Sequence, residues 1–177
     1  TWYPRAVPTS DLDLLTQWRG GDRQAGQRLF RRHFAAVARF FCNKADSDHE
    51  DLVQRTFVGC LEGADRFRAE CSFRTYLLRI AYHVLCSHYR TKYRRGEALT
   101  PSEVSLRDLS SSPSSVVARN RRHQQLIEAL RMMSIDYQVV LELYFWEEMT
   151  AAEIAGVLEI PLGTAQTRLR RAREGLA

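Results

Sequence analysis

TAAEIAGVLEIPLGTAQTRLRRAREGLA, residues 150–177, is the stretch of sequence that decides the fold. Thr150 and Glu153 have the spacing of a capping box, in which the hydroxyl accepts one free helix amide and the carboxylate accepts another. An apolar face follows at helical spacing, made by Ile154, Ala155 and Leu158. Pro161 and Gly163 predict the turn that ends this helix. A second helical pattern comes next, so the stretch indicates a helix-turn-helix unit.

The second helix of this unit is apolar on one side and basic on the others. Its predicted buried stripe is Ala165, Leu169, Ala172 and Leu176. Thr164, Arg168 and Arg171 share another face, with Thr167 beside them. Arginine contacts phosphates and reads guanine, and glutamine suits adenine. A solvated basic helix would show the same pattern, but the capped helix and tight turn before it favour a helix that enters a DNA groove.

Composition also favours a polyanionic partner. The chain has 177 residues, 45% of them hydrophobic, which is enough for one large or two small domains. Its net charge is +5 and its pI is about 9.3. The charge is uneven, because residues 43–66 hold six acidic and three basic residues whereas residues 79–95 hold five basic and no acidic ones. This asymmetry predicts two partners, one protein and one nucleic acid.

Other classes of function find little support in the sequence. No nucleophile elbow, phosphate loop or H-E-x-x-H segment appears, so we expect no enzyme. The cysteines form no C-x-x-C pair and fit no standard zinc spacing, so we expect reduced core residues and neither a metal nor a cofactor; they are Cys42, Cys60, Cys71 and Cys86. No secretory signal or membrane-spanning apolar run is visible, which predicts a cytoplasmic protein.

The rest of the chain reads as helices without a convincing strand. Ser10 is expected to cap a short helix with Leu12 on its apolar side, and Gly20-Gly21 to end it. Asp22 is expected to cap a helix through residue 41, and Ser72 one through residue 93. Between them, a helix over 49–64 has a predicted apolar side made by Leu52, Val53, Phe57, Cys60 and Leu61. Residues 66–71 predict a loop.

Residues 96–118 differ in kind from the flanking segments. They hold Pro101, Pro113 and seven serines, a composition typical of a flexible linker. Helical periodicity resumes at Arg119. The predicted fold class is therefore all-α, with two small helical domains at 1–95 and 119–177 joined by the linker at 96–118. Drawn out at ~3.3 Å per residue, this linker would span about 75 Å, or roughly two turns of DNA at ~34 Å each.

Four segments, in this order, resemble the extracytoplasmic-function (ECF, group 4) sigma factors of the sigma-70 family, which serve bacterial RNA polymerase. GDRQAGQRLFRRHF (21–34) resembles the start of the family's region 2, and EDLVQRTF (50–57) its polymerase-binding helix. FRAECSFRTYLLRIAYHVLCSHYR (67–90) resembles its promoter-melting loop and −10 recognition helix. MTAAEIAGVLEIPLGTAQTRLRRAR (149–173) resembles region 4, the −35 reader. The match covers almost the whole chain.

The resemblance implies a transcription initiation factor with three sets of site residues. The set expected to bind core RNA polymerase is Glu50, Asp51 and Gln54. The set expected at the −10 element is Arg66, Phe67, Tyr76, Arg79, His83, Arg90, Lys92, Arg94 and Arg95. The set expected at the −35 element is Thr164, Gln166, Thr167, Arg168, Arg170 and Arg171. Extracting a base from the duplex costs a few kcal/mol, so the loop at 66–71 must offer stacking, for which Phe67 and Phe73 are candidates unless both belong to the core.

The chain departs from the family pattern at five positions. Tyr76 stands where the family usually has Trp, His83 where Asn is common, and Ser87 where Asp is common. Gln138 replaces a common Arg, and Glu148 a common Gly. These substitutions bear on −10 specificity and on the geometry that leads into the helix-turn-helix.

The expected partners are core RNA polymerase, promoter DNA and an anti-sigma factor of the kind that is often membrane-anchored in this family. The chain itself is expected to lie outside the membrane and to be otherwise monomeric. Three alternatives remain open at this point. One is a sigma-like decoy that sequesters an anti-sigma factor without reading DNA, which the basic DNA-facing helices argue against. A simple DNA-binding repressor would bind duplex without polymerase. A metal- or redox-sensing regulator that binds DNA would carry stoichiometric zinc or reactive thiols.

Overall fold

The protein is helical throughout the part that the structure describes. The computed structural model describes residues 9–45, 48–96, 127–130 and 132–175, and no strand occurs among them. This confirms the predicted all-α class. Among the same residues, no helix is both long and apolar enough to cross a membrane. The expected linker at 96–118, apart from Gly96, lies outside the described residues.

The N-terminal helical unit consists of α1 (Asp11–Arg19), α2 (Arg23–Cys42), α3 (His49–Gly63), the 3-10 turn η1 (Ala64–Arg66) and α4 (Phe73–Arg94). The three predicted caps are confirmed. Ser10 accepts the amide of Asp13, Asp22 accepts two amides of the first turn of α2, and Ser72 accepts the amide of Thr75. Each cap satisfies amides that have no partner inside the helix, which fixes where these helices begin.

The C-terminal helical unit consists of α6 (Ile135–Phe145), α7 (Ala151–Leu158) and α8 (Leu162–Glu174). The predicted capping box at the start of α7 is present, with Thr150 and Glu153 bonded reciprocally. The Glu153 carboxylate accepts hydrogen bonds from both the amide and the hydroxyl of Thr150. They hold the pKa of the Glu153 carboxyl below its usual value. The unit is thus built from short helices whose ends are set locally.

The turn between α7 and α8 differs from the prediction. Glu159 ends α7 with φ 54°, in the left-handed region, and its amide bonds back to Ala155. Pro161 occupies the cap position of α8. Gly163, expected in the turn, lies inside the first turn of α8, and its φ is not positive. The chain reversal is therefore made by a non-glycine residue, which the sequence pattern could not identify because glycine is the usual choice there.

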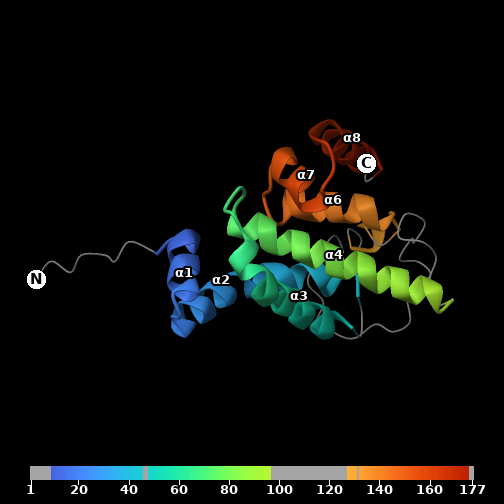
Figure 1. Cartoon of the computed structure of the whole chain (residues 1–177). Helices are drawn as coiled ribbons and strands as arrows, with labels where there is room; N and C mark the ends of the chain where they lie inside the picture. Colours follow the sequence, from blue (N-terminus) through green and yellow to red (C-terminus); the bar gives the residue numbers. More distant parts are fainter. Residues whose placement is uncertain (1–8, 46–47, 97–126, 131, 176–177) are drawn as a thin grey trace, which may run out of the picture.

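The long helix α4 lies in the middle of the molecule (Figure 1). On one side it packs against α2 and α3, and on the other against α7 of the C-terminal unit. The buried apolar side chains of both units form one continuous cluster that extends from Leu14 to Ala172. Any function assigned to the surface of α4 therefore has to take account of both neighbours.

Two apolar residues expected on buried faces are exposed. Leu12 of α1 and Leu61 of α3 are each 51% exposed, whereas Leu52, Val53 and Cys60 of α3 are buried as expected. The apolar face of α3 is broader than the surface that α2 and α4 cover. A single exposed apolar side chain is common on protein surfaces, and only a contiguous exposed patch marks a binding surface.

We expect Thr150→Ala to lower the free energy of unfolding by about 1 kcal/mol, because it removes the hydroxyl that caps α7. Ser134→Ala is the matched control, since Ser134 holds the same position before α6 but makes no capping hydrogen bond through its side chain. Urea denaturation followed by circular dichroism measures both. Equal losses in the two variants would contradict a stabilising cap at Thr150.

Candidate nucleic-acid interface

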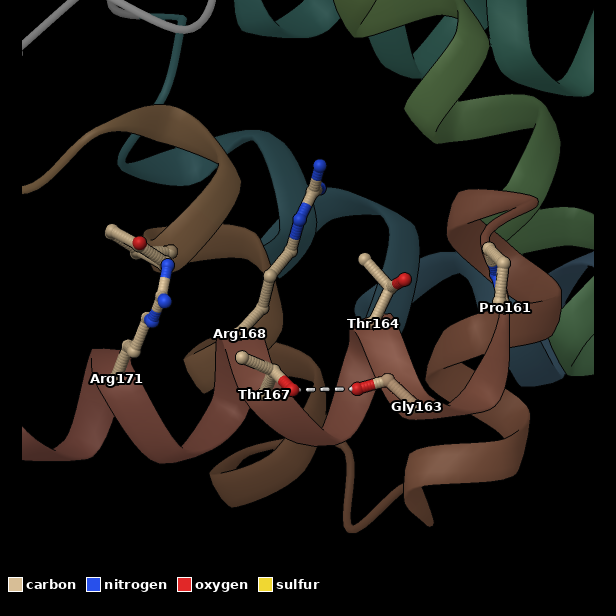
Figure 2. A pocket seen from close by; sticks show the side chains of 7 residues that line it. Pro161, Gly163, Thr164, Thr167, Arg168 and Arg171 are labelled. Carbon is tan, nitrogen blue, oxygen red and sulfur yellow. Dashed lines mark hydrogen bonds between the residues drawn. The ribbon is translucent and has the colours of Figure 1, made fainter.

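The exposed side of α8 carries most of the residues predicted to read DNA. Thr164, Thr167, Arg168 and Arg171 line one shallow groove of about 500 Å³, together with Pro161 and Tyr137. Figure 2 shows Thr164, Arg168 and Arg171 projecting to the same side of the helix, and Thr167 donating its hydroxyl to the Gly163 carbonyl at 2.8 Å. The shared face predicted from the spacing is therefore present in the structure.

The remaining two residues of the −35 set lie on a different side of α8. Gln166 and Arg170 line a second groove with Arg173. Arg170 is paired with Glu174 at 2.7 Å, and Arg168 is paired with Asp136 of α6 at 3.2 Å. Arg171 is exposed and forms no ion pair within the described residues. The set therefore divides into a groove-facing group and a flanking pair.

The segment at 66–71 borders a larger groove of about 680 Å³. Arg66, Phe67, Tyr76 and Arg79 of the predicted −10 set all line it. Its opposite wall comes from α7, through Ala152, Glu153 and Gly156. Ala69 in this segment has φ 57°, a left-handed conformation that is strained for a residue with a side chain. The −10 residues near this segment are thus gathered around one groove that the C-terminal unit closes on one side.

The aromatic residues of this segment are largely buried. Phe67 is only 7% exposed, and its ring lies 4.6 Å from that of Tyr76 and 6.1 Å from that of Phe73. Tyr76 packs so closely to the backbone that a Cβ at Gly63 would collide with its hydroxyl. Burial raises the pKa of the Tyr76 hydroxyl. In this arrangement Phe67 and Phe73 act as core residues, and stacking of either one on a base stays a prediction.

The other basic residues of the −10 set lie at the far end of α4. Arg90, Arg94 and Arg95 are exposed, and Lys92 lies 3.5 Å from Asp48. At ~1.5 Å of rise per residue, this end is ~20 Å along the helix from Arg79. The structure therefore splits the −10 set into a group at the groove and a basic group at the end of α4.

Arg79 and His83 contact the C-terminal unit directly. Arg79 donates to the Gly156 carbonyl at 2.8 Å and lies 3.9 Å from the Glu159 carboxylate. His83 Nε2 lies 2.9 Å from the other oxygen of Glu159. Both residues belong to the predicted −10 set, and in this structure their polar atoms contact carbonyl and carboxylate oxygens of the C-terminal unit.

The predicted polymerase-binding residues lie on the exposed side of α3. Glu50, Asp51 and Gln54 are all exposed. Asp51, Gln54, Val58 and Leu61 follow at spacings of three, four and three, so they form one helix face. Val58 is 44% and Leu61 51% exposed. A face that mixes acidic, polar and apolar groups has the composition of a protein-binding surface.

Beyond this acidic and apolar face, the structure reveals polar contacts between the two units that local patterns did not predict. We call them the charged seam: Lys44, Arg39 and Arg74 of the N-terminal unit with Glu142 and Glu147 of the C-terminal unit. Lys44 pairs with Glu142, and both residues are nearly fully buried, at 2% and 3% exposed. Glu147 is 4% exposed and bonds Arg39 at 2.8 Å through one oxygen and Arg74 through the other.

Two of the departures from the family pattern acquire a structural explanation here. Gln138 is fully buried and donates to the second oxygen of Glu142 at 2.9 Å, so it orients the carboxylate that meets Lys44. Glu148 has φ 51°, the region in which glycine is unstrained. This chain therefore holds a strained residue at a position where glycine is common in the family that the sequence resembles.

Arg19 is a second feature that the sequence did not reveal. It reaches from the end of α1 and donates to the Ala64 carbonyl at 3.0 Å through Nε and to the Phe67 carbonyl at 2.6 Å through Nη2. The guanidinium fork thereby ties the two ends of η1 to α1. The only sequence signal is a basic residue in the last turn of a helix. Such a residue usually indicates no more than a favourable interaction with the helix dipole.

The cysteines and histidines are not arranged as a metal site in the described part of the chain. No group of three or more His, Cys, Asp or Glu side chains is close enough there to hold an ion. Cys60 is fully buried, and burial raises the pKa of its thiol to about 12. Cys42, expected in the core, is exposed.

Two family models match the chain. The model described as sigma-70 region 2 matches residues 28–95, and the model described as sigma-70, region 4 matches residues 123–176. Relatives include RNA polymerase sigma factor YlaC of Bacillus subtilis (strain 168), 29% identical over 85% of this chain and 89% of the relative. The ECF RNA polymerase sigma-E factor of Escherichia coli (strain K12) is 24% identical over 94% of this chain and 92% of the relative.

Two solved structures resemble this one over most of its length. The sigma factor RpoE, in complex with the anti-sigma factor NepR from Bartonella quintana, has a TM-score of 0.68 at 20% identity, covering 85% of this chain and 92% of that chain. CnrH, in complex with the cytosolic domain of CnrY, has a TM-score of 0.64 at 25% identity, covering 95% of this chain and 94% of that chain. The first of these supports the fold alone.

We expect Arg19→Ala to speed amide hydrogen exchange in residues 64–72 by at least about tenfold, because hydrogen bonds from a charged donor contribute ~1.5–3 kcal/mol. Arg23→Ala, which removes an exposed arginine at the start of α2, is the control and should leave this segment unchanged. Exchange monitored by mass spectrometry reports on both variants. Unchanged protection in Arg19→Ala would mean that the segment holds its conformation without α1.

Proposed function

The chain belongs to the extracytoplasmic-function branch of the sigma-70 family, and on that premise we propose that it binds core RNA polymerase and directs it to specific promoters. Membership of the family confirms the resemblance found in the sequence motifs. The proposal gives the two helical units different tasks. We assign residues 1–95 to polymerase binding and the −10 element, 96–118 to the linker, and 119–177 to the −35 element. Such a factor acts by binding, and no catalytic step is assigned to it.

The observation that carries this proposal is the groove-facing side of α8. It presents Thr164, Thr167, Arg168 and Arg171 on an exposed helix that follows a capped helix and a tight turn. In a helix-turn-helix the second helix enters the major groove, where arginine reads guanine and the threonines contact base edges or phosphates. Gln166 and Arg170, on the adjacent side, are placed to contact the flanking backbone. Recognition at the −35 element is the function that we assign to this face.

For the −10 element we propose that the groove beside residues 66–71 receives the opened strand. Arg66 and Arg79 line it and supply charge for phosphates, and Tyr76 supplies an aromatic face. Arg90, Arg94 and Arg95, exposed at the far end of α4, extend the positive surface along the backbone. Since phosphate contacts release counterions, we expect promoter binding that weakens steeply as salt concentration rises.

We propose that the exposed face of α3 docks on the polymerase. Asp51 and Gln54 supply polar contacts, and Val58 and Leu61 supply an apolar centre that would be buried in the complex. The neighbouring Phe34 of α2 is 54% exposed and stacks on Phe57 of α3, which extends this apolar surface. A basic partner surface with an apolar depression would complement it.

We also propose that an anti-sigma factor controls the chain. The two similar solved structures are both complexes, RpoE with the anti-sigma factor NepR and CnrH with the cytosolic domain of CnrY. The exposed apolar residues on α2 and α3 give such an inhibitor a surface that it would share with the polymerase. Competition between the two proteins for this face would then hold the factor inactive until the inhibitor is removed.

Reconstituted transcription tests the proposal as a whole. Core polymerase with this chain should start transcription at a defined subset of promoters in a genomic DNA library, and core enzyme alone should not. A decoy would bind its inhibitor yet start no transcript with any core enzyme. A simple repressor would bind promoter duplex equally well without polymerase.

We expect Leu61→Lys to weaken binding to core polymerase by about tenfold, which corresponds to ~1.4 kcal/mol at the centre of an interface. Leu12→Lys is the matched control, because Leu12 has the same 51% exposure but lies on α1. Fluorescence anisotropy with labelled chain and purified core enzyme measures both affinities. Equal weakening in the two variants would rule out the assigned face of α3.

We expect Arg171→Ala to weaken promoter binding by the polymerase complex and to reduce the slope of log affinity against log salt by about one. Arg173→Ala removes the same charge from the same helix but lies on the side that faces the second groove. The affinity of the polymerase complex for the promoter should change less in Arg173→Ala than in Arg171→Ala. Filter binding across a salt series measures both variants, and indistinguishable salt slopes would count against the groove-facing side of α8 as the −35 reader.

A further inference from the structure

The two arginines of the groove on α8 differ in what surrounds them. Arg168 Nη1 lies 3.2 Å from the Asp136 carboxylate of α6. Arg171 lines the same groove, is exposed and forms no ion pair within the described residues. Two arginines about one turn apart on one helix face therefore have different freedom to move.

We propose that Asp136 is a positioning residue that holds the Arg168 guanidinium for reading one guanine of the −35 element, and that it lowers the affinity of the same arginine for phosphate. The ligand is then a G·C base pair in the major groove, contacted through the guanine O6 and N7 atoms. The inference rests on the proposed function, in which the groove-facing side of α8 contacts the −35 element.

The backbones that carry the pair are fixed by buried neighbours. Asp136 is in the first turn of α6, directly after the buried Ile135, and Arg168 directly precedes the buried Leu169 of α8. The first turn of a helix also favours a negative side chain through the helix dipole. The separation of the two side chains is therefore set by the packing of α6 on α8.

Partial burial distinguishes this ion pair from the other one on α8. The side chains of Arg168 and Asp136 are 29% and 26% exposed. Those of Arg170 and Glu174 are 64% and 60% exposed. Ion pairs that water surrounds contribute little and are screened by salt. The carboxylate of Asp136 therefore restricts its arginine more strongly than Glu174 restricts Arg170.

The contact with Asp136 leaves Arg168 with donors for a base. A guanidinium has five N–H donors in a planar fork, and two of them pair with guanine O6 and N7. Asp136 contacts one nitrogen, Nη1, so the Nη2 and Nε donors remain for the base. Holding the side chain before binding reduces the conformational entropy that is lost in the complex, which favours the base that fits the fixed fork.

The same carboxylate opposes phosphate binding by Arg168. An Arg168–Asp136 pair has no net charge, so it attracts a phosphate less than an unpaired arginine does, whereas the guanine edge binds through directed hydrogen bonds. Arg171 keeps its full charge and can reach the DNA backbone. The two arginines then differ in role, because Arg168 reads a base and Arg171 positions the helix on the duplex.

Selection from a promoter library tests the base reading. The full chain is bound to core polymerase, and a duplex library with a randomised −35 element is sequenced before and after binding. Arg168→Ala identifies the base pair that Arg168 reads, as the position at which a preference for guanine is lost. We expect Asp136→Asn to reduce that preference by roughly tenfold, within the discrimination that one bidentate contact provides, and to leave the other positions unchanged.

Glu174→Gln is the matched control, because it removes the same charge from beside an arginine of the same helix that lies outside the groove. It should change no position. Adding Asp136→Asn to Arg168→Ala should have no further effect on base preference. A preference that survives Asp136→Asn, a loss that is equal at all positions, or an Arg168→Ala variant that alters none would overturn the inference.

Binding of the same polymerase complexes to a mixed-sequence duplex without promoter elements tests the effect on phosphate. The slope of log affinity against log salt should become steeper by about one in Asp136→Asn, because Arg168 then contacts a phosphate, and should not change in Glu174→Gln. Equal slopes in the two variants would overturn this part of the inference. If the wild-type complex selects no −35 sequence, the proposed function is contradicted as well, whereas a selected sequence that Asp136→Asn reads equally well overturns the inference alone.

Discussion

The buried pair of Lys44 and Glu142 is the interaction on which the arrangement of the molecule depends. Moving two charges out of water is unfavourable by several kcal/mol for each ion, so the pair is stable only when every surrounding group is in place. Those groups come from distant parts of the chain: the Phe40 carbonyl of α2, and Gln138 of α6. The Lys44 carbonyl in turn accepts the Tyr89 hydroxyl of α4 at 2.5 Å. One residue in the α2–α3 connection therefore fixes α2, α4 and α6 with respect to one another.

This constraint gives α4 two neighbours and two roles. Its buried residues Leu77, Ala81 and Leu85 belong to the hydrophobic core. Arg79 and His83 lie between these turns and point to α7. A helix that serves as the core of one unit cannot move freely, so access to its polar side has to come from movement of the other unit.

The features that the sequence predicted are the ones that depend on near neighbours in the chain. The caps at Ser10, Asp22, Ser72 and Thr150 are local hydrogen bonds, and the stripe Ala165, Leu169 and Ala172 is a local periodicity. The shared face of Thr164, Arg168 and Arg171 follows from the same helical geometry. Family resemblance added the assignment of roles, which periodicity alone does not provide.

The features that escaped prediction depend on which surfaces meet across the fold. Leu61 fits an apolar stripe, but α2 and α4 do not extend far enough to cover it. Gly163 looked like a turn residue, yet Glu159 makes the turn in a conformation that few side chains adopt. The contacts of Glu142 and Glu147 could not be predicted, because the partner of a charged side chain does not appear in its local sequence.

The charged character of the seam has a further physical consequence. Separating the two units would expose part of the continuous apolar cluster that they share, as well as the charged seam. Carboxylates such as Glu147 become hydrated on opening, and the arginines they release are left ready for phosphate. Carboxylate and phosphate compete for the same guanidinium groups, so Arg74 cannot contact Glu147 and a phosphate at the same time.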